Sequence, residues 1–233
     1  MSLLLWFERR VTTILVAALW AIAASVHAAG GHHSVDDAVL VDPGQCQVEL
    51  WADRFAATSR GLGHVGPACR FAAIEWGVNL DRITAHGEPT NFVYGVQAKW
   101  ARPLVDSVTA GVVVAATWQS NAPRAFTGGT VIVPLTWQAD DTVLVHVNLG
   151  RDFLSGMADS NRAGIALEWS PTNDWSFVAE RYHENKRNFW RAGARFAINQ
   201  NLSLDLSRAS DFGRTERAAS AWWTLGVNWA FDR

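Results

Sequence analysis

The most constraining feature of this chain is a period of two in its hydropathy. The stretch WWTLGVNWAF, residues 222–231, places large apolar side chains at every second position and small or polar side chains between them. Successive side chains of a β-strand point to opposite faces, so this strand has one apolar and one polar face. The alternation recurs along most of the chain, which is typical of strands with lipid on one side and a polar lumen on the other.

The alternating segments follow one another too closely for helical crossovers between them. Mostly short turns alternate with mostly longer loops, as on the two sides of a membrane barrel. We therefore predict an all-β fold, a transmembrane antiparallel up-and-down β-barrel of about 12 strands, with 10 or 14 as alternatives. The expected strands lie near residues 46–55, 63–70, 71–83, 91–102, 108–119, 130–138, 142–153, 162–170, 174–184, 188–198, 201–209 and 221–231.

The N-terminus has the features of an export signal. Arg9 and Arg10 precede an apolar run over residues 11–24, and small residues lead up to Ala28. We expect a signal peptide over residues 1–28 that is cleaved after export. A retained signal anchor is the alternative, although the apolar run is short for a membrane-spanning helix.

The segment after the signal peptide has no strand period. Residues 29–45 open with small and polar side chains, which predicts a flexible periplasmic leader before a barrel over residues 46–233. Its histidines, His32 and His33, precede two aspartates, and imidazole with carboxylate is a ligand set for copper, nickel or zinc. Weak metal binding by the leader and a polar leader with incidental histidines both remain open, and no other cofactor is expected.

Charge and cysteine content narrow the class further. The chain has 20 Lys+Arg and 22 Asp+Glu, a net charge of −2, which gives no reason to expect a nucleic-acid partner. The two cysteines, Cys46 and Cys69, would reach an oxidising compartment after export, and a pair there is expected to form a disulfide. Two free, buried thiols are the alternative.

Tryptophan supplies another indication, because most of the 13 tryptophans lie near the ends of the expected strands, as in the aromatic girdles of membrane barrels. The signal peptide, the alternating strands and the aromatic-rich last strand resemble the bacterial outer-membrane β-barrel class over residues 46–231. In that class the last strand ends on an aromatic residue, whereas here Phe231 is followed by Asp232 and Arg233. The resemblance implies an outer-membrane location, contact with lipid and lipopolysaccharide, and insertion by the barrel-assembly machinery.

The polar faces of the expected strands predict the lining of the lumen. Hairpin pairing sets Arg195 opposite Asp205 and brings Glu180 near Arg191. Such a lining favours a narrow porin-like channel for a small hydrophilic solute or ion, or else a sealed barrel with a structural or surface-interaction role. The residues proposed for the lumen are Lys99, His146, Glu180, Arg191, Arg195 and Asp205.

Four basic residues are expected on the outward face at the extracellular ends of their strands. Charges are tolerated there because the site lies near the membrane interface, where they could pair with lipopolysaccharide phosphates. Solvated loop flanks are the alternative. The residues are Arg151, Arg181, His183 and Arg208.

An enzymatic barrel, such as a lipase or deacylase, would need a serine beside a histidine at the lipid-facing rim. His183 is expected at the level of this rim, but no serine is securely placed on the same face of a neighbouring strand. His146 is assigned to the lumen without a serine or carboxylate clearly beside it. We therefore expect no catalytic residues.

Overall fold

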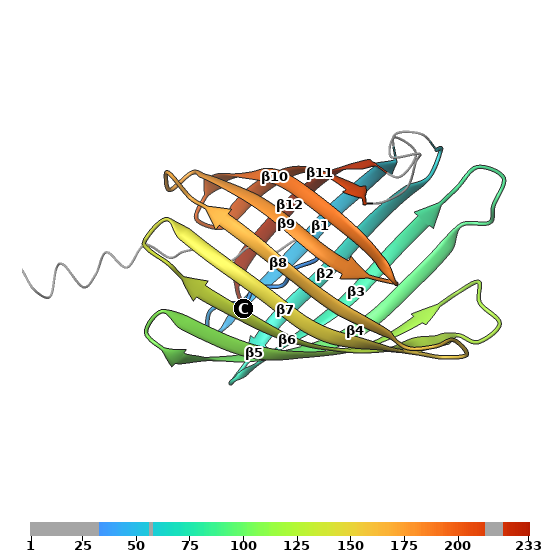
Figure 1. The fold of residues 1–233 in the computed structure, drawn as a ribbon, viewed down its shortest axis with the longest axis horizontal. Helices are drawn as coiled ribbons and strands as arrows, with labels where there is room; N and C mark the ends of the chain where they lie inside the picture. Colours follow the sequence, from blue (N-terminus) through green and yellow to red (C-terminus); the bar gives the residue numbers. More distant parts are fainter. Residues whose placement is uncertain (1–32, 56–57, 213–220) are drawn as a thin grey trace, which may run out of the picture.

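A computed structural model of the chain describes residues 33–55, 58–212 and 221–233. Twelve antiparallel strands close into a barrel (Figure 1), and no helix occurs among the described residues. The strands are β1 Gln45–Phe55, β2 Gly61–Phe71, β3 Ile74–Thr84, β4 Asn91–Val105, β5 Val108–Gln119, β6 Phe126–Gln138, β7 Val143–Leu154, β8 Ser160–Trp169, β9 Trp175–Glu184, β10 Arg187–Asn199, β11 Leu202–Asp211 and β12 Trp222–Asp232.

Each strand pairs with the next one along the chain, and β12 pairs back with β1. The closing register runs from Gln45 opposite Asp232 to Phe55 opposite Trp222. Closure leaves no strand edge with unpaired backbone groups, which a membrane requires because lipid offers them no hydrogen bonds. The predicted all-β up-and-down barrel of twelve strands is confirmed.

The two faces of the barrel differ as the period of two predicts. Leu149 and Leu225 are 64% and 62% exposed, whereas Glu168 and Asp205, on inward positions, are each 1% exposed. In a soluble protein this distribution would be reversed. The apolar groups face outward and the charged groups face inward because the surroundings are lipid and the interior is polar.

The two ends of the barrel also differ. Short turns lie at the end that holds the C-terminus, on the left in Figure 1, and most of the longer loops lie at the other end. By the usual asymmetry of outer-membrane barrels, the end with the C-terminus is periplasmic and the other end is extracellular. Within the described ranges there is no helix long and apolar enough to cross a membrane.

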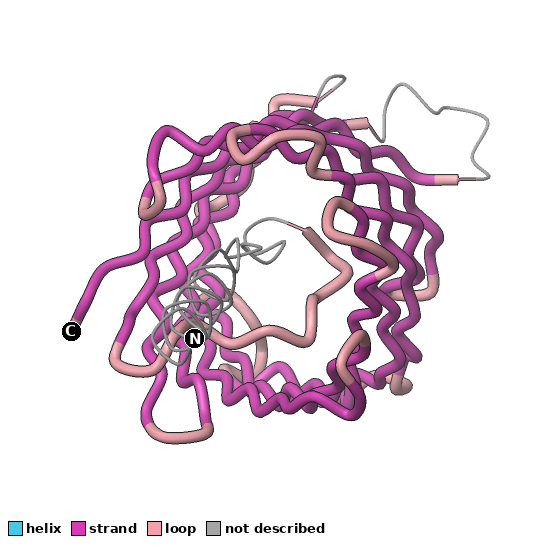
Figure 2. The backbone as a smooth tube through the Cα atoms, turned by 90° about the vertical axis from the view of Figure 1, so that its left-hand side faces the viewer, coloured by secondary structure: helices cyan, strands magenta, loops and turns pink. Residues whose placement is uncertain are grey.

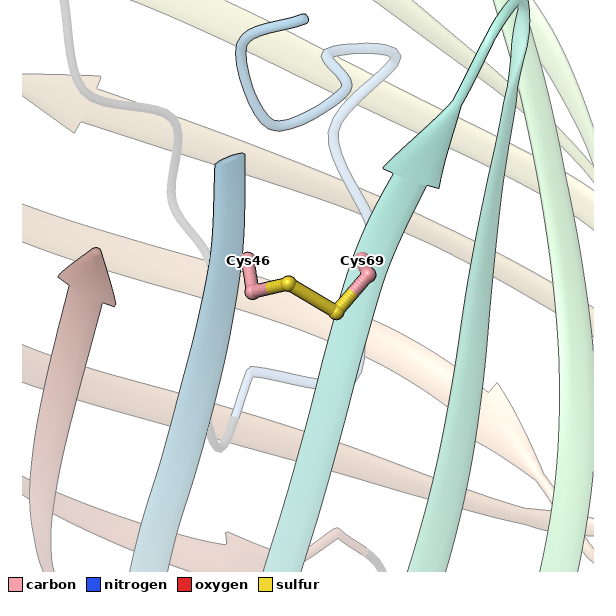
Figure 3. Close-up of a disulfide and its surroundings, with 2 residues drawn as sticks. All are labelled: Cys46 and Cys69. Atoms are coloured by element: carbon pink, nitrogen blue, oxygen red, sulfur yellow. A yellow bond between two sulfur atoms is a disulfide. The ribbon is translucent and has the colours of Figure 1, made fainter. Parts of the chain in front are cut away.

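A disulfide joins the first two strands at the periplasmic end. Cys46 of β1 lies opposite Cys69 of β2, and the two sulfur atoms are bonded (Figure 3). The predicted disulfide is confirmed. It ties the strand that closes the barrel to its neighbour.

The N-terminal segment occupies a position that the sequence did not predict. Residues 33–44 lie inside the ring of strands and lead into β1 (Figure 2), whereas a flexible leader in the periplasm was expected. The segment has no regular structure, but its backbone and carboxylates form contacts with the lumen wall. The predicted signal peptide, residues 1–28, and His32 lie outside the described residues.

Candidate functional site

A two-pronged arginine–carboxylate pair of the lumen joins β10 to β11. Arg195 Nε donates to Asp205 Oδ1 at 2.7 Å, and its Nη2 donates to Asp205 Oδ2 at 3.1 Å. Asn228 of β12 also donates to the Asp205 carboxylate. This two-pronged geometry is the strong form of an arginine–carboxylate pair. The predicted pairing of Arg195 with Asp205 is confirmed by the strand register.

A second ion pair lies closer to the extracellular end of the lumen. Arg191 of β10 is opposite Glu180 of β9, as predicted, and Arg191 Nη1 is 3.4 Å from Glu180 Oε1. The guanidinium carbon of Arg191 lies 6.0 Å from the ring centre of Tyr182 and 5.9 Å from that of Trp222. Aromatic faces attract a cation, so these rings help to hold Arg191 inside the barrel.

The described N-terminal segment, residues 33–44, is held by hydrogen bonds from its backbone to wall side chains. Ser34 N and Val35 N both donate to the carboxylate of Glu180, at 3.1 and 2.9 Å. Two further backbone amides, those of Ala38 and Val41, donate at 2.8 Å to Thr136 Oγ1 and Glu75 Oε2. The partners lie on β9, β6 and β3, so the segment follows a wide arc of the inner wall.

Lys99 of β4 adds a charge contact to this arc. Its Nζ lies 3.0 Å from Asp37 Oδ1 and 3.9 Å from Asp36 Oδ1. Lys99 and Asp37 are both buried, and buried charges are stable only when they are paired. The ion pair therefore ties the segment to the wall. Sequence reasoning placed Lys99 in the lumen but did not identify its partner.

Val35 gives the segment an apolar anchor. It packs in a buried cluster with Ala166, Val178 and Tyr182 of β8 and β9. Gly164 of β8 makes this possible, because a Cβ at that position would lie 2.6 Å from Val35 Cγ2. A glycine on the inner face thus leaves the space that Val35 fills.

The wall formed by β1, β2, β3 and β12 carries a different set of side chains. His64 Nδ1 lies 2.5 Å from Asp81 Oδ1, and the imidazole stacks on Trp51 with the ring centres 4.6 Å apart. Nearby, the hydroxyl of Thr224 donates to Asp53 Oδ1. Sequence reasoning missed His64 and Asp53 as site residues; the alternation of β2, which carries His64, is faint.

Arginine–carboxylate pairs also line the extracellular end of the lumen. Arg162 of β8 contacts Asp152 of β7 at 2.8 Å and Glu184 of β9 at 2.5 Å. Arg187 of β10 pairs with Asp211 of β11. None of these residues was proposed from the sequence, although all five belong to inward positions or hairpin ends of the predicted strands.

His146 has neighbours that the sequence analysis did not find. Its Nδ1 lies 2.9 Å from Thr136 Oγ1, and its Nε2 lies 3.5 Å from Glu168 Oε2. The expectation that no carboxylate stands beside His146 was therefore wrong, because pairing of β7 with β8 brings Glu168 to the same layer. The imidazole is fully buried, and the Thr136 hydroxyl accepts the hydrogen bond from Ala38 N.

The four residues predicted to contact lipopolysaccharide lie near the extracellular ends of their strands. Arg151 contacts Asp159 at 3.1 Å, and Arg181 and Arg208 lie over the rings of Phe212 and Trp223. His183 contacts Asn188, and the strand register places Asn188 and Ala163, not a serine, opposite it. Lipopolysaccharide contact by these residues stays a prediction.

The metal prediction for the leader is also open. His33 Nδ1 lies 3.9 Å from Glu180 Oε1, inside the barrel. Among residues 33–55, 58–212 and 221–233, no group of three or more histidine, cysteine or carboxylate side chains has the arrangement of a metal site. His32 falls outside these ranges, so copper, nickel or zinc binding by the leader remains a prediction.

A closed barrel with an apolar outer face and a charged interior defines the class of bacterial outer-membrane β-barrels. A profile described as "Uncharacterised conserved protein UCP029691" matches residues 15–231, and the chain belongs to this family. No curated protein matches the sequence.

Solved structures of outer-membrane porins share the fold. The KdgM porin aligns with a TM-score of 0.65 at 8% identity, over 79% of this chain and 99% of the porin. The NanC porin aligns with a TM-score of 0.56 at 9% identity, over 81% and 99% of the two chains. Omp33 of Acinetobacter baumannii aligns with a TM-score of 0.50 at 11% identity, over 80% and 98%. The chain therefore shares the fold of these outer-membrane porins.

Proposed function

We propose that the protein is a channel for a small hydrophilic solute or ion, and that its own residues 33–44 narrow the channel. The observation that carries this proposal is the set of contacts between that segment and Glu75, Lys99, Thr136 and Glu180 on the inner wall. A segment held in this way restricts passage without closing the whole cross-section by itself.

The strand count supports a conducting interior. Side chains alone fill a barrel of about eight strands, whereas porins of 16 or more strands leave a wide aqueous channel. Twelve strands give an intermediate width, which leaves room for the segment and for a path beside it. One structure of the similar KdgM porin is a complex with disordered oligogalacturonate, a hydrophilic solute. This supports the solute class and leaves its identity open.

The charges of the lumen favour cations over anions. Five inward basic residues each lie within 4 Å of a carboxylate: Lys99, Arg162, Arg187, Arg191 and Arg195. On the opposite wall, Asp81 contacts a histidine and Asp53 contacts a threonine, and among the described residues neither forms an ion pair with a lysine or arginine. Carboxylates in excess along a narrow path select cations.

The experiment is a reversal-potential measurement on the purified barrel in planar bilayers under a salt gradient. The proposal expects conductance with a preference for potassium over chloride, and a weaker preference in the Asp53→Asn, Asp81→Asn double variant. Asp106→Asn, in the turn after β4, is the matched control and should leave selectivity unchanged. Anion preference in the wild-type protein would contradict the proposed selectivity.

A second candidate is a sealed barrel with a structural or surface-interaction role. The same contacts favour it, because the segment passes through the interior of the barrel (Figure 2) and is tied to a wall lined with ion pairs. Well-folded protein that gives silent bilayers, both as wild type and after release of the segment, would support this candidate. Hydrolysis of labelled lipid by the pure protein would support an enzymatic role instead.

A further inference from the structure

The outer wall has a groove near its extracellular end. The groove has a volume of about 470 Å³ and crosses β3, β2, β1, β12 and β11. Strand register puts its outward residues into two parallel rows. The row nearer the membrane centre runs Arg82, Gly63, Ala52, Leu225 and Leu206.

The second row lies one step closer to the extracellular rim. It runs from Thr84 and Gly61 through Arg54 to Trp223, and Arg208 lies beyond on β11. Thr84 donates to the carbonyl oxygen of Gly61, which keeps the ends of β2 and β3 together. The two rows therefore present arginines above a strip of very small residues.

The floor of the groove is backbone. Gly63 has open space on its outward side, because no atom lies within 4 Å of an added Cβ, and its neighbour in the row is Ala52. The side wall of the groove formed by β11 and β12 is apolar, because the large side chains of Leu206, Leu225 and Trp223 project outward from the barrel. A groove with a flat backbone floor and one apolar side wall fits an extended hydrocarbon chain.

Among the described residues, the arginines around the groove have no acidic partner. Arg54, Arg82 and Arg208 form no ion pair within the described parts of the chain, although Arg208 lies 5.5 Å over the ring of Trp223. Guanidinium groups bind phosphate oxygens in pairs, and such charges are tolerated near the membrane interface. Basic residues around an acyl-sized groove complement a lipid with phosphate groups.

We propose that this groove binds lipopolysaccharide of the outer leaflet, with one acyl chain on the Gly63–Ala52 floor and a lipid A phosphate between Arg54 and Arg82. The site is separate from the lumen and does not depend on conduction. It extends the lipid contact expected for Arg208 to two arginines that the sequence did not single out.

The test measures lipid adducts of the purified protein by native mass spectrometry, with lipid A added to detergent micelles. In the Arg54→Ala, Arg82→Ala double variant, lipid A affinity should fall by about tenfold. Arg102→Ala removes an outward arginine at the periplasmic end of β4 and should leave the affinity unchanged. Equal affinity in the double variant and the wild-type protein would overturn the proposal.

A second variant tests the acyl chain separately from the phosphate. Gly63→Phe fills the groove without a clash, whereas Val65→Phe places the same ring outside it on the same strand and face. The first change should reduce lipid A binding and the second should not. If dephosphorylated lipid A or phosphatidylethanolamine competes as well as lipid A, the wall binds lipid without selection and the proposed site does not exist.

Discussion

The Nζ of Lys99 lies 3.0 Å from Oδ1 of Asp37, so one ion pair joins the barrel wall to the segment inside it. Both groups are buried, and each would be costly without the other. Removal of the lysine should therefore weaken docking of the segment more than loss of one hydrogen bond would.

Lys99→Met is expected to release residues 33–44 from the wall. Breaking a buried pair by removing one partner costs about 3–5 kcal/mol, because the remaining charge is left uncompensated. Limited proteolysis from the periplasmic side should then cut the segment in the variant and leave it intact in the wild-type protein. In the Lys99→Met, Asp37→Asn double variant no lone charge remains, so protection should partly return.

Gly164→Val is expected to displace the segment by a steric route. A Cβ at Gly164 would lie 2.6 Å from Val35 Cγ2 and 3.1 Å from Tyr182 Cβ. The segment can move more easily than the strand, so the same proteolytic assay should show cleavage. Combining Gly164→Ala with Val35→Ala restores space and should restore protection. Full protection of Gly164→Val would mean that the segment does not pass over this glycine.

Arg195→Ala is expected to shift ion selectivity toward cations. The change removes the positive partner of Asp205, which is 1% exposed and then carries an unpaired charge at the lumen wall. Asp205→Asn should shift the reversal potential in the opposite direction. Reversal potentials in bilayers under a salt gradient measure both effects, and unchanged values would place this pair outside the conduction path.

Loss of the disulfide is expected to destabilise the barrel without changing its fold. Cys46 and Cys69 are 23 residues apart, and closing a loop of that size stabilises the folded state by about 3 kcal/mol. The Cys46→Ala, Cys69→Ala variant should unfold at lower urea concentration in detergent. Mass spectrometry of the wild-type protein without reductant should find no alkylatable thiol.

The turn between β6 and β7 is expected to lose stability at low pH. The pKa of the Asp140 carboxyl lies below its ordinary value, because Thr142 N, the Thr142 hydroxyl and Val143 N all donate to it. Its contribution is therefore complete above the ordinary value near 3.8 and is lost as the pH falls through the lower folded value. A carboxyl-carbon NMR titration measures this, and Asp140→Asn should abolish the low-pH step.

The strands were predictable because each one carries its own signal. Outward Val145 and Leu149 of β7 alternate with inward His146 and Asn148, and lipid and lumen impose that alternation locally. Pairing followed from the hairpin order, so the contacts of Arg195 with Asp205 and of Arg191 with Glu180 were predictable as well. Strand β2 carries a weaker signal, because it contains Pro67 and three glycines, and His64 was overlooked there.

The N-terminal segment was not predictable because its order comes from distant residues. Ser34 is 146 positions from Glu180, and Ala38 is 98 positions from Thr136. A stretch that opens with polar residues and has no strand period looks flexible when its partners are unknown. The three-residue contact of Arg162 with Asp152 and Glu184 was missed for a similar reason, since it depends on side-chain reach across three strands.

The central claim is that residues 33–44 lie in the conduction path and narrow it. Single-channel recording of the wild-type protein and of Lys99→Met under identical salt conditions tests it most directly. The account predicts a small conductance for the wild-type protein and a larger or longer-lasting open level for the variant. Equal conductance in the two proteins, with proteolysis showing that the segment has been released in the variant, would contradict it.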